Sequence, residues 1–192
     1  MKFFTAKQTG LVSIAAILLA ACSGPSTHTK TEENTVDKQA AISVSGLSSG
    51  AYMALQFHLA HSEKVVGSGL IAAGPYFCAQ GSIGTALQDC VANPDANINL
   101  KVMSDTIVQY QKDGKLAAPK YNQNDKVWLL HGTLDTRIIR PVAEKLAEQV
   151  STIFGPSNTR YISDKAFSHV MPTLNSGTDC TESSSPFIGN CQ

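Results

Sequence analysis

The sequence predicts an α/β fold in which a parallel sheet carries flanking helices. Short apolar, β-prone runs alternate along the chain with stretches of helical spacing, and Gly, Pro or polar residues separate them. The 192 residues, 43% hydrophobic and 16% charged, have the balance of one globular domain. Strands that alternate with helices form right-handed βαβ units, and their ligands bind beyond the C-terminal ends of the strands.

Seven segments are predicted in order. The expected strands are apolar and bounded by turn residues, and they cover residues 40–46, 65–73, 126–131 and 158–163. The expected helices have apolar residues at helical spacing or lack Gly and Pro, and they cover residues 51–61, 100–111 and 141–154. Pro141 suits the first helical turn and Gly155 the C-terminal cap of the last helix.

The first 21 residues are predicted to be a lipoprotein signal peptide. Lys2 and Lys7 precede an apolar run over residues 10–21, which is too short to span a bilayer comfortably. The run ends in Leu-Ala-Ala before Cys22, which resembles the lipobox of bacterial lipoproteins and implies a diacylated Cys22 as membrane anchor. Ordinary signal cleavage beside an incidental cysteine is the alternative. Either way we expect an exported protein, lipid-anchored or secreted.

Residues 22–38 are predicted to be a flexible tether, and residues 39–192 the folded domain. The tether is rich in Ser, Thr, Lys, Glu and Asn and cannot bury enough apolar surface to offset its ordering entropy. The formal net charge of the chain is zero, without a Lys/Arg stripe, so we expect no nucleic-acid partner.

The five cysteines support an exported domain with disulfides. Lipidation of Cys22 leaves an even number, namely Cys78, Cys90, Cys180 and Cys191. Four cysteines allow three pairings. Pairing within each close pair, which would clip two short loops, is favoured but not deduced.

The segment Gly-Leu-Ser-Ser-Gly over residues 46–50 fits the G-x-S-x-G nucleophile elbow and lies between an expected strand and an expected helix. We therefore predict an α/β-hydrolase-like fold with Ser48 as nucleophile and the backbone N–H of Ser49 as oxyanion-hole donor. Glycines at both flanks are expected because a Cβ there would collide with its neighbours. A Gly/Ser-rich turn is the alternative interpretation.

A serine nucleophile needs a base and an acid, in the chain order Ser, acid, His for this fold. Asp135 follows the third expected strand, and His169 lies in the loop after the fourth. Competing aspartates are Asp125, Asp164 and Asp179. The other histidines are His28, His58, His61 and His131, and packing or solvated roles are expected for them, His131 fixing the acid loop. No metal-ligand spacing is present, and we expect no metal.

The chain is similar to the poly(3-hydroxybutyrate) depolymerase family of secreted esterases. The resembling segments, spread over about residues 42–191, are VSGLSSGAYMA, AAGPYFCA, HGTLD, SHVMPT and DC…SPFIGNC. The resemblance implies nucleophile Ser48, acid Asp135, base His169 and an oxyanion-hole donor at Ser49. It also implies esters of 3-hydroxy acids, as polymers or oligomers, as substrates, without a cofactor.

Two departures from the family pattern stand out. Ser168 occupies a position where a glycine is expected before the histidine, which could stiffen or shift that loop. Members of the family look like a circular permutation of an ordinary α/β-hydrolase, in which the remaining strands follow the histidine. The chain is therefore expected to carry the triad and about half a sheet. An open edge beside residues 40–46 would then favour self-association. Another esterase or a peptidase on the same fold, or a truncated non-catalytic lipoprotein remnant, are the alternatives.

Overall fold

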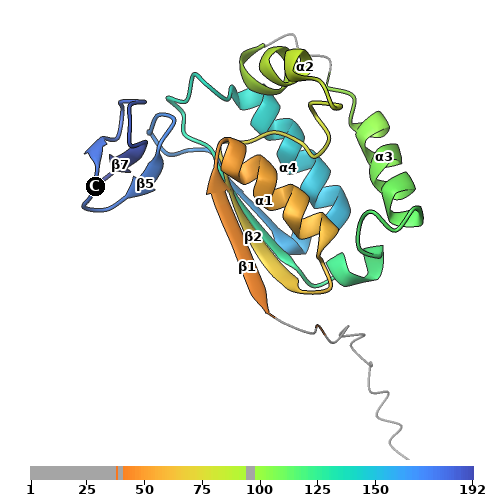
Figure 1. The fold of residues 1–192 in the computed structure, drawn as a ribbon. Helices are drawn as coiled ribbons and strands as arrows, with labels where there is room; N and C mark the ends of the chain where they lie inside the picture. The colour runs from red at the N-terminus through yellow and green to blue at the C-terminus, as the bar shows by residue number, and fades with distance from the viewer. Residues whose placement is uncertain (1–37, 39–40, 94–97) are drawn as a thin grey trace, which may run out of the picture. The chain divides into compact units, whose positions relative to one another are not determined.

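The computed structural model describes residues 38, 41–93 and 98–192. The expected signal peptide, Cys22 and the tether up to residue 37 lie outside the described residues. A four-stranded sheet forms the centre of the fold, and its strands are all parallel. They are β1 (Ile42–Leu47), β2 (Val65–Ile71), β3 (Lys126–Leu130) and β4 (Thr159–Ile162) (Figure 1). The predicted α/β fold and its four strands are confirmed.

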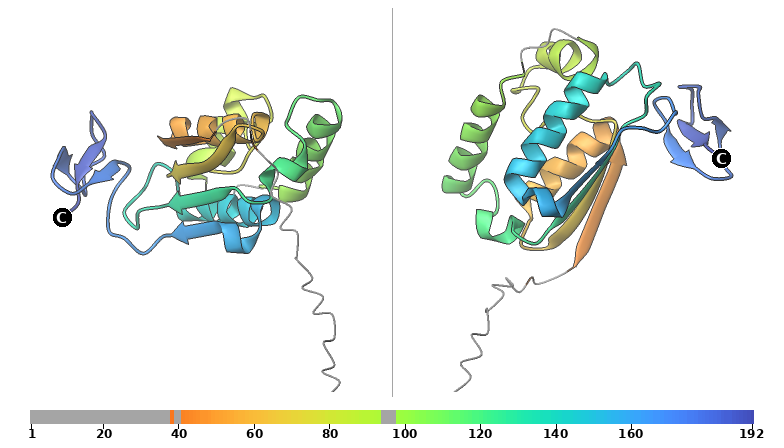
Figure 2. Two further views of the ribbon diagram at one scale, coloured as in Figure 1. Left: turned by 90° about the horizontal axis from the view of Figure 1, so that it is seen from below. Right: turned by 180° about the vertical axis from the view of Figure 1, so that it is seen from behind.

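The strands lie in chain order, which places every crossover on the same face when all have the same hand (Figure 2). The long helices are α1 (Ser49–Ala60), α3 (Leu100–Lys112) and α4 (Arg140–Phe154), close to the predicted bounds. Buried side chains of all three join Val127 and Leu129 of β3 in one core. Trp128, which points the other way by strand alternation, is 37% exposed on the opposite face.

The long connection between β2 and α3 holds two short helices that the sequence did not predict. They are α2 (Ile83–Leu87) and a π-helix (Gln88–Ala92), and a disulfide joins Cys90 of the π-helix to Cys78, which precedes α2. Two 3₁₀ turns, Pro119–Asn122 and Pro156–Asn158, were also not predicted.

The C-terminal residues form a second small sheet, which was not predicted either. Its strands are β5 (Met171–Thr173), β6 (Thr178–Asp179) and β7 (Ile188–Asn190), in the order β5-β7-β6 (Figures 1 and 2). The second disulfide joins Cys180 to Cys191. Both disulfides are therefore the local pairs that the cysteine spacing favours.

Strand β1 is an edge of the main sheet. Among the described strands it pairs with β2 alone, and Ile42 is 39% exposed at its start. Lys38, at the end of the predicted tether, binds the Asp125 carboxylate and the Val65 carbonyl at the start of β2. Within the part of the chain that the structure describes, no helix is long and apolar enough to cross a membrane.

Candidate active site

Ser48 stands at the turn between β1 and α1 in a strained backbone conformation. Its φ of 57° and ψ of −124° are rare for a residue other than glycine. The backbone holds this turn, because the Ser48 N–H donates to the Ile71 carbonyl at 2.9 Å and the Ser48 carbonyl accepts from Ala51 and Tyr52. Ser48 is the N-cap of α1, yet its side chain makes no capping hydrogen bond. The hydroxyl is therefore available for chemistry.

The two glycines that flank this serine differ in what they do. A Cβ at Gly46 would strike the Gly50 carbonyl and come within 2.7 Å of the Ala51 nitrogen, so the strand and helix pack too closely for any side chain there. At Gly50 a Cβ would meet nothing within 4 Å. The expectation that a Cβ collides at both flanks is correct for Gly46 and wrong for Gly50, because residue 50 already lies in the helix.

The loops that carry Asp135 and His169 extend the pairing of β3 with β4. The His131 N–H donates to the Ile162 carbonyl at 2.9 Å, beyond the last ladder pair. Further along, the Leu134 N–H donates to the Phe167 carbonyl at 3.1 Å. Gly132 permits this contact, since a Cβ would strike the same carbonyl. The two loops are thus joined backbone to backbone at residues that precede Asp135 and His169.

Asp135 and His169 form a buried hydrogen-bonded pair. The Nδ1–H of His169 donates to Oδ2 of Asp135 at 2.9 Å, and the residues are 5% and 7% exposed. The other carboxylate oxygen, Oδ1, accepts from the N–H groups of Arg137 and Ile138 at 2.9 and 3.0 Å. The carboxylate is therefore fixed by three donors, and the imidazole keeps Nε2 for another partner.

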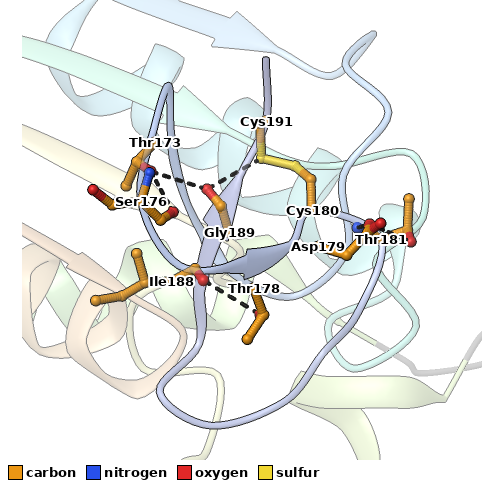
Figure 3. The surroundings of a disulfide bond; sticks show 9 residues. All are labelled: Thr173, Ser176, Thr178, Asp179, Cys180, Thr181, Ile188, Gly189 and Cys191. Atoms are coloured by element: carbon orange, nitrogen blue, oxygen red, sulfur yellow. Dashed lines mark hydrogen bonds between the residues drawn. A yellow bond between two sulfur atoms is a disulfide. The ribbon is translucent and has the colours of Figure 1, made fainter.

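The small C-terminal sheet supports the His169 loop. Ser168 donates its N–H to the Cys180 carbonyl at 2.9 Å, and Cys180 is joined to Cys191 within the sheet (Figure 3). Ser168 is buried and is not among the residues with positive φ, so this position does not need the glycine that the family resemblance led us to expect. The disulfide thus lies one hydrogen bond from the residue beside His169.

Ser48, Ser49 and His169 line one cavity of about 890 Å³. Its volume is in the range of small-molecule sites, and most of its lining is apolar or aromatic. Tyr52 lies in its wall and donates its hydroxyl to the Cys90 carbonyl. Burial raises the pKa of Tyr52, which keeps this hydroxyl protonated and in a supporting role.

The hydrogen bonds of the described residues include none between the Ser48 hydroxyl and His169. Such a bond is often long in an enzyme without substrate. Because α1 begins at Ser49, the first N–H groups of the helix have no acceptor within it. They and the positive end of the helix dipole favour negative charge next to Ser48.

A second Ser, His and Asp group occupies the core. His58 on α1 contacts the Ser68 hydroxyl at 3.0 Å through Nδ1 and Asp125 at 2.8 Å through Nε2. None of the three lines the cavity, and all are buried, so this group packs α1 onto β2. Packing is the role expected for His58, and Asp125 is thereby occupied away from His169.

The remaining competing acids are at the surface. Asp164 pairs with Lys165, and Asp179 accepts from Thr181. His131 is 1% exposed, and its Nδ1 has no hydrogen-bond partner among the described residues. Burial lowers the pKa of His131, with opposing pulls from Asp135 and Arg140. The backbone of His131 joins the two loops. We expected its side chain to fix the loop that carries Asp135, but it makes no hydrogen bond to that loop among the described residues.

No cluster of three or more His, Cys, Asp or Glu side chains suited to a metal ion occurs among residues 38, 41–93 and 98–192. The arrangement at the cavity is instead suited to acyl transfer. It combines a half-buried serine at a strained turn, unpaired N–H groups beside it and a histidine oriented by a buried carboxylate.

Comparison with known proteins identifies relatives for this arrangement. No family model matches the sequence. The chain is 36% identical over 149 residues to a poly(3-hydroxybutyrate) depolymerase of Delftia acidovorans, covering 77% of this chain and 30% of that protein. It is 29% identical over 193 residues to a polyhydroxybutyrate depolymerase of Talaromyces funiculosus, covering 98% and 53%. The chain therefore spans about half or less of the length of these relatives.

Two solved structures share the fold. One is a PHB depolymerase from Penicillium funiculosum, and the other is a PHB depolymerase variant complexed with an R3HB trimer. Each gives a TM-score of 0.69 at 28% identity and covers 81% of this chain and 48% of the solved chain. The α/β-hydrolase type of sheet expected from the elbow is confirmed by this likeness.

Proposed function

Because the chain belongs to the poly(3-hydroxybutyrate) depolymerase family, we propose that it is a serine esterase that hydrolyses esters of 3-hydroxy acids, in polymers or oligomers. The observation that carries the proposal is the hydrogen bond between His169 and Asp135 at the cavity that Ser48 lines. A loop serine alone would be a turn, and a buried His–Asp pair alone would be packing. Their meeting at one apolar cavity favours catalysis.

In the proposed mechanism the Ser48 hydroxyl attacks the ester carbonyl and His169 takes its proton through Nε2. Asp135 holds the imidazole in the tautomer that leaves Nε2 free to accept, and it stabilises the cation that forms. The Ser49 N–H at the start of α1 binds the oxyanion. His169 then protonates the leaving alcohol, and water releases the acyl group by the same steps in reverse.

The test uses a covalent probe and a substrate. A fluorophosphonate should label the wild-type chain at Ser48, and Ser48→Ala should abolish both labelling and the hydrolysis of 3-hydroxybutyrate oligomers. Ser49→Ala is the matched control, because it keeps the backbone N–H and removes a hydroxyl next to the nucleophile. Unchanged labelling of Ser48→Ala would overturn the assignment of the nucleophile.

We also propose that the chain is exported and attached to a membrane through a diacylated Cys22. The two disulfides support export, because such bonds persist in oxidising compartments. Cys22 lies outside the described residues, so the anchor depends on the sequence pattern. Cys22→Ser should move the protein from the membrane pellet to the soluble periplasmic or culture fraction. A mutant that stays in the pellet would contradict lipid anchoring.

A further inference from the structure

The cavity beside Ser48 has a single charged side chain in its described lining, that of Arg137. Much of the remaining lining is aromatic or aliphatic and includes Tyr76, Phe77, Leu87 and Val91. Arg137 is exposed, so water weakens its charge interactions, and its attraction for an anion comes mainly from directed hydrogen bonds. A positive group at this place therefore favours a ligand that is mostly apolar and has one negative charge.

The Arg137 guanidinium is held in place without being neutralised. Its Nε–H donates to the Ser183 hydroxyl at 2.8 Å, and its Cζ lies 5.4 Å from the centroid of the Phe187 ring. Phe187 also lines the cavity, with a φ of 58° that is unusual for an aromatic residue. No carboxylate of the described residues forms an ion pair with Arg137. Four of its five N–H donors remain for a ligand.

The backbone of Arg137 belongs to the loop that carries Asp135. Its own backbone N–H donates to Oδ1 of Asp135, which positions the start of its side chain relative to the His169 pair. A ligand whose ester carbonyl reaches Ser48 would therefore lie in the same cavity as this guanidinium. Planar, two-pronged hydrogen bonding makes arginine well suited to a carboxylate.

We propose that Arg137 is a specificity-determining residue that binds the free carboxylate at one end of a short 3-hydroxy acid ester. The inference rests on the proposed esterase function. Every linear oligomer of a hydroxy acid has one carboxylate end, so this contact would favour short soluble oligomers over neutral esters. The competing explanation is that Arg137 only ties the acid loop to the C-terminal segment through Ser183 and Phe187.

The kinetic test compares the 3-hydroxybutyrate trimer as free acid with its methyl ester, which lacks only the charge. Arg137→Gln should lower the ratio of kcat/KM for the acid to kcat/KM for the methyl ester about tenfold, mainly through KM. Arg137→Lys should restore part of the ratio. Arg160→Gln removes an equal charge from an exposed side chain of β4, outside the cavity, and should leave the ratio unchanged. Equal losses on both substrates, or an unchanged ratio in Arg137→Gln, would overturn the proposal in favour of the structural role.

A binding measurement separates this proposal from the esterase function. Calorimetry of the free-acid trimer with Ser48→Ala and with Ser48→Ala/Arg137→Gln needs no turnover, and the second variant should bind about tenfold more weakly. If the wild type hydrolyses no ester and Ser48 resists fluorophosphonate, the proposed function fails while the two dissociation constants still decide the role of Arg137. Equal constants, or no measurable binding by Ser48→Ala, would refute the carboxylate site.

Discussion

Replacing Asp135 by asparagine should remove activity while leaving the fold intact. The Asn side-chain oxygen can still accept from the Arg137 and Ile138 N–H groups that now bind Oδ1. Its NH₂ group then takes the place of Oδ2 and faces Nδ1 of His169. An NH₂ donor requires an accepting Nδ1, so the proton moves to Nε2 and the ring can no longer take one from Ser48.

The expected loss follows from this change of tautomer. In a serine triad the same substitution lowers kcat by about 10⁴-fold. That loss corresponds to about 5 kcal/mol of transition-state stabilisation. The melting temperature should change little, because the two backbone donors keep their acceptor. Asp135→Ala leaves those two N–H groups without their acceptor, so this variant should lose both activity and stability.

The chain contains its own control in the second buried aspartate that binds a histidine. Asp125 contacts His58 at 2.8 Å and also binds Lys38, with the His58 and Asp125 side chains 0% and 2% exposed. Asp125→Asn weakens a buried charged group and should cost about 3 kcal/mol. In a domain of this size that is a fall in melting temperature of about 6 to 12 °C. At 20 °C its kcat should remain near that of the wild type.

Thermal scans and steady-state hydrolysis of a 3-hydroxybutyrate oligomer, run on the same preparations, give both quantities. The two variants should behave in opposite ways. Asp135→Asn should lose activity with little change in melting temperature, whereas Asp125→Asn should lose stability with little change in kcat. If Asp135→Asn keeps kcat within tenfold of the wild type, the orientation of His169 by Asp135 is not what catalysis needs. If Asp125→Asn is inactive though folded, the buried group is functional after all.

Three further expectations concern the turn, the buried histidine and the edge strand. Gly46→Ala should destabilise by about 3 kcal/mol through its clash with the Gly50 carbonyl, whereas Gly50→Ala should stabilise by about 0.5 to 1 kcal/mol, and denaturant titration of both checks the contrast. Burial lowers the pKa of His131 below its ordinary 6.5, so just below pH 6.5 the unfolded chain binds a proton at His131 and the folded chain does not. Stability should therefore be full above pH 6.5 and decline as the pH falls below it, and His131→Gln should flatten that decline in melting temperature. Residues 23–192 should self-associate with rising concentration in size-exclusion chromatography, and Ile42→Lys on the exposed edge of β1 should shift the chain to monomer; a monomeric wild type at all concentrations would contradict pairing at this edge.

The main sheet and its long helices could be predicted because each has a local signal. Apolar β-prone runs of six to nine residues predicted the strands, and Pro141 and Gly155 marked the two ends of α4. These signals depend on neighbours along the chain, which a sequence displays directly. The bounds were correct to within one or two residues at most ends.

Elements held by distant contacts could not be predicted in this way. The small C-terminal sheet has strands of two or three residues, and its order is fixed by pairing to β7 and by the Cys180–Cys191 bond. The π-helix contains Cys90, which the other disulfide ties to Cys78. Such short segments have no periodicity to detect, and closure rather than propensity stabilises them.

The same distinction between local signals and distant contacts applies to the residues of the candidate site. Ser48, Asp135 and His169 were found from motif and chain order, which the fold converts into proximity. Arg137 was missed because its importance depends on Ser183, 46 residues further along the chain, and on Phe187. A charged residue in a polar loop is ordinary in a sequence and becomes unusual only when it is the sole charge in the described lining of an apolar cavity.

The proximity of the three groups has a simple origin in the sheet. Ser48 follows β1, Asp135 follows β3 and His169 follows β4, and because these strands are parallel, all three loops emerge at the same edge. The hydrogen bonds between β3 and β4 continue into the loops that carry Asp135 and His169. The pairing of the two strands therefore sets how these two side chains face each other. The proposed attack by Ser48 therefore depends on the four parallel strands of the main sheet. The selectivity proposed for Arg137 depends instead on a side chain in a less regular loop, and that side chain can be exchanged while its backbone N–H still binds Asp135.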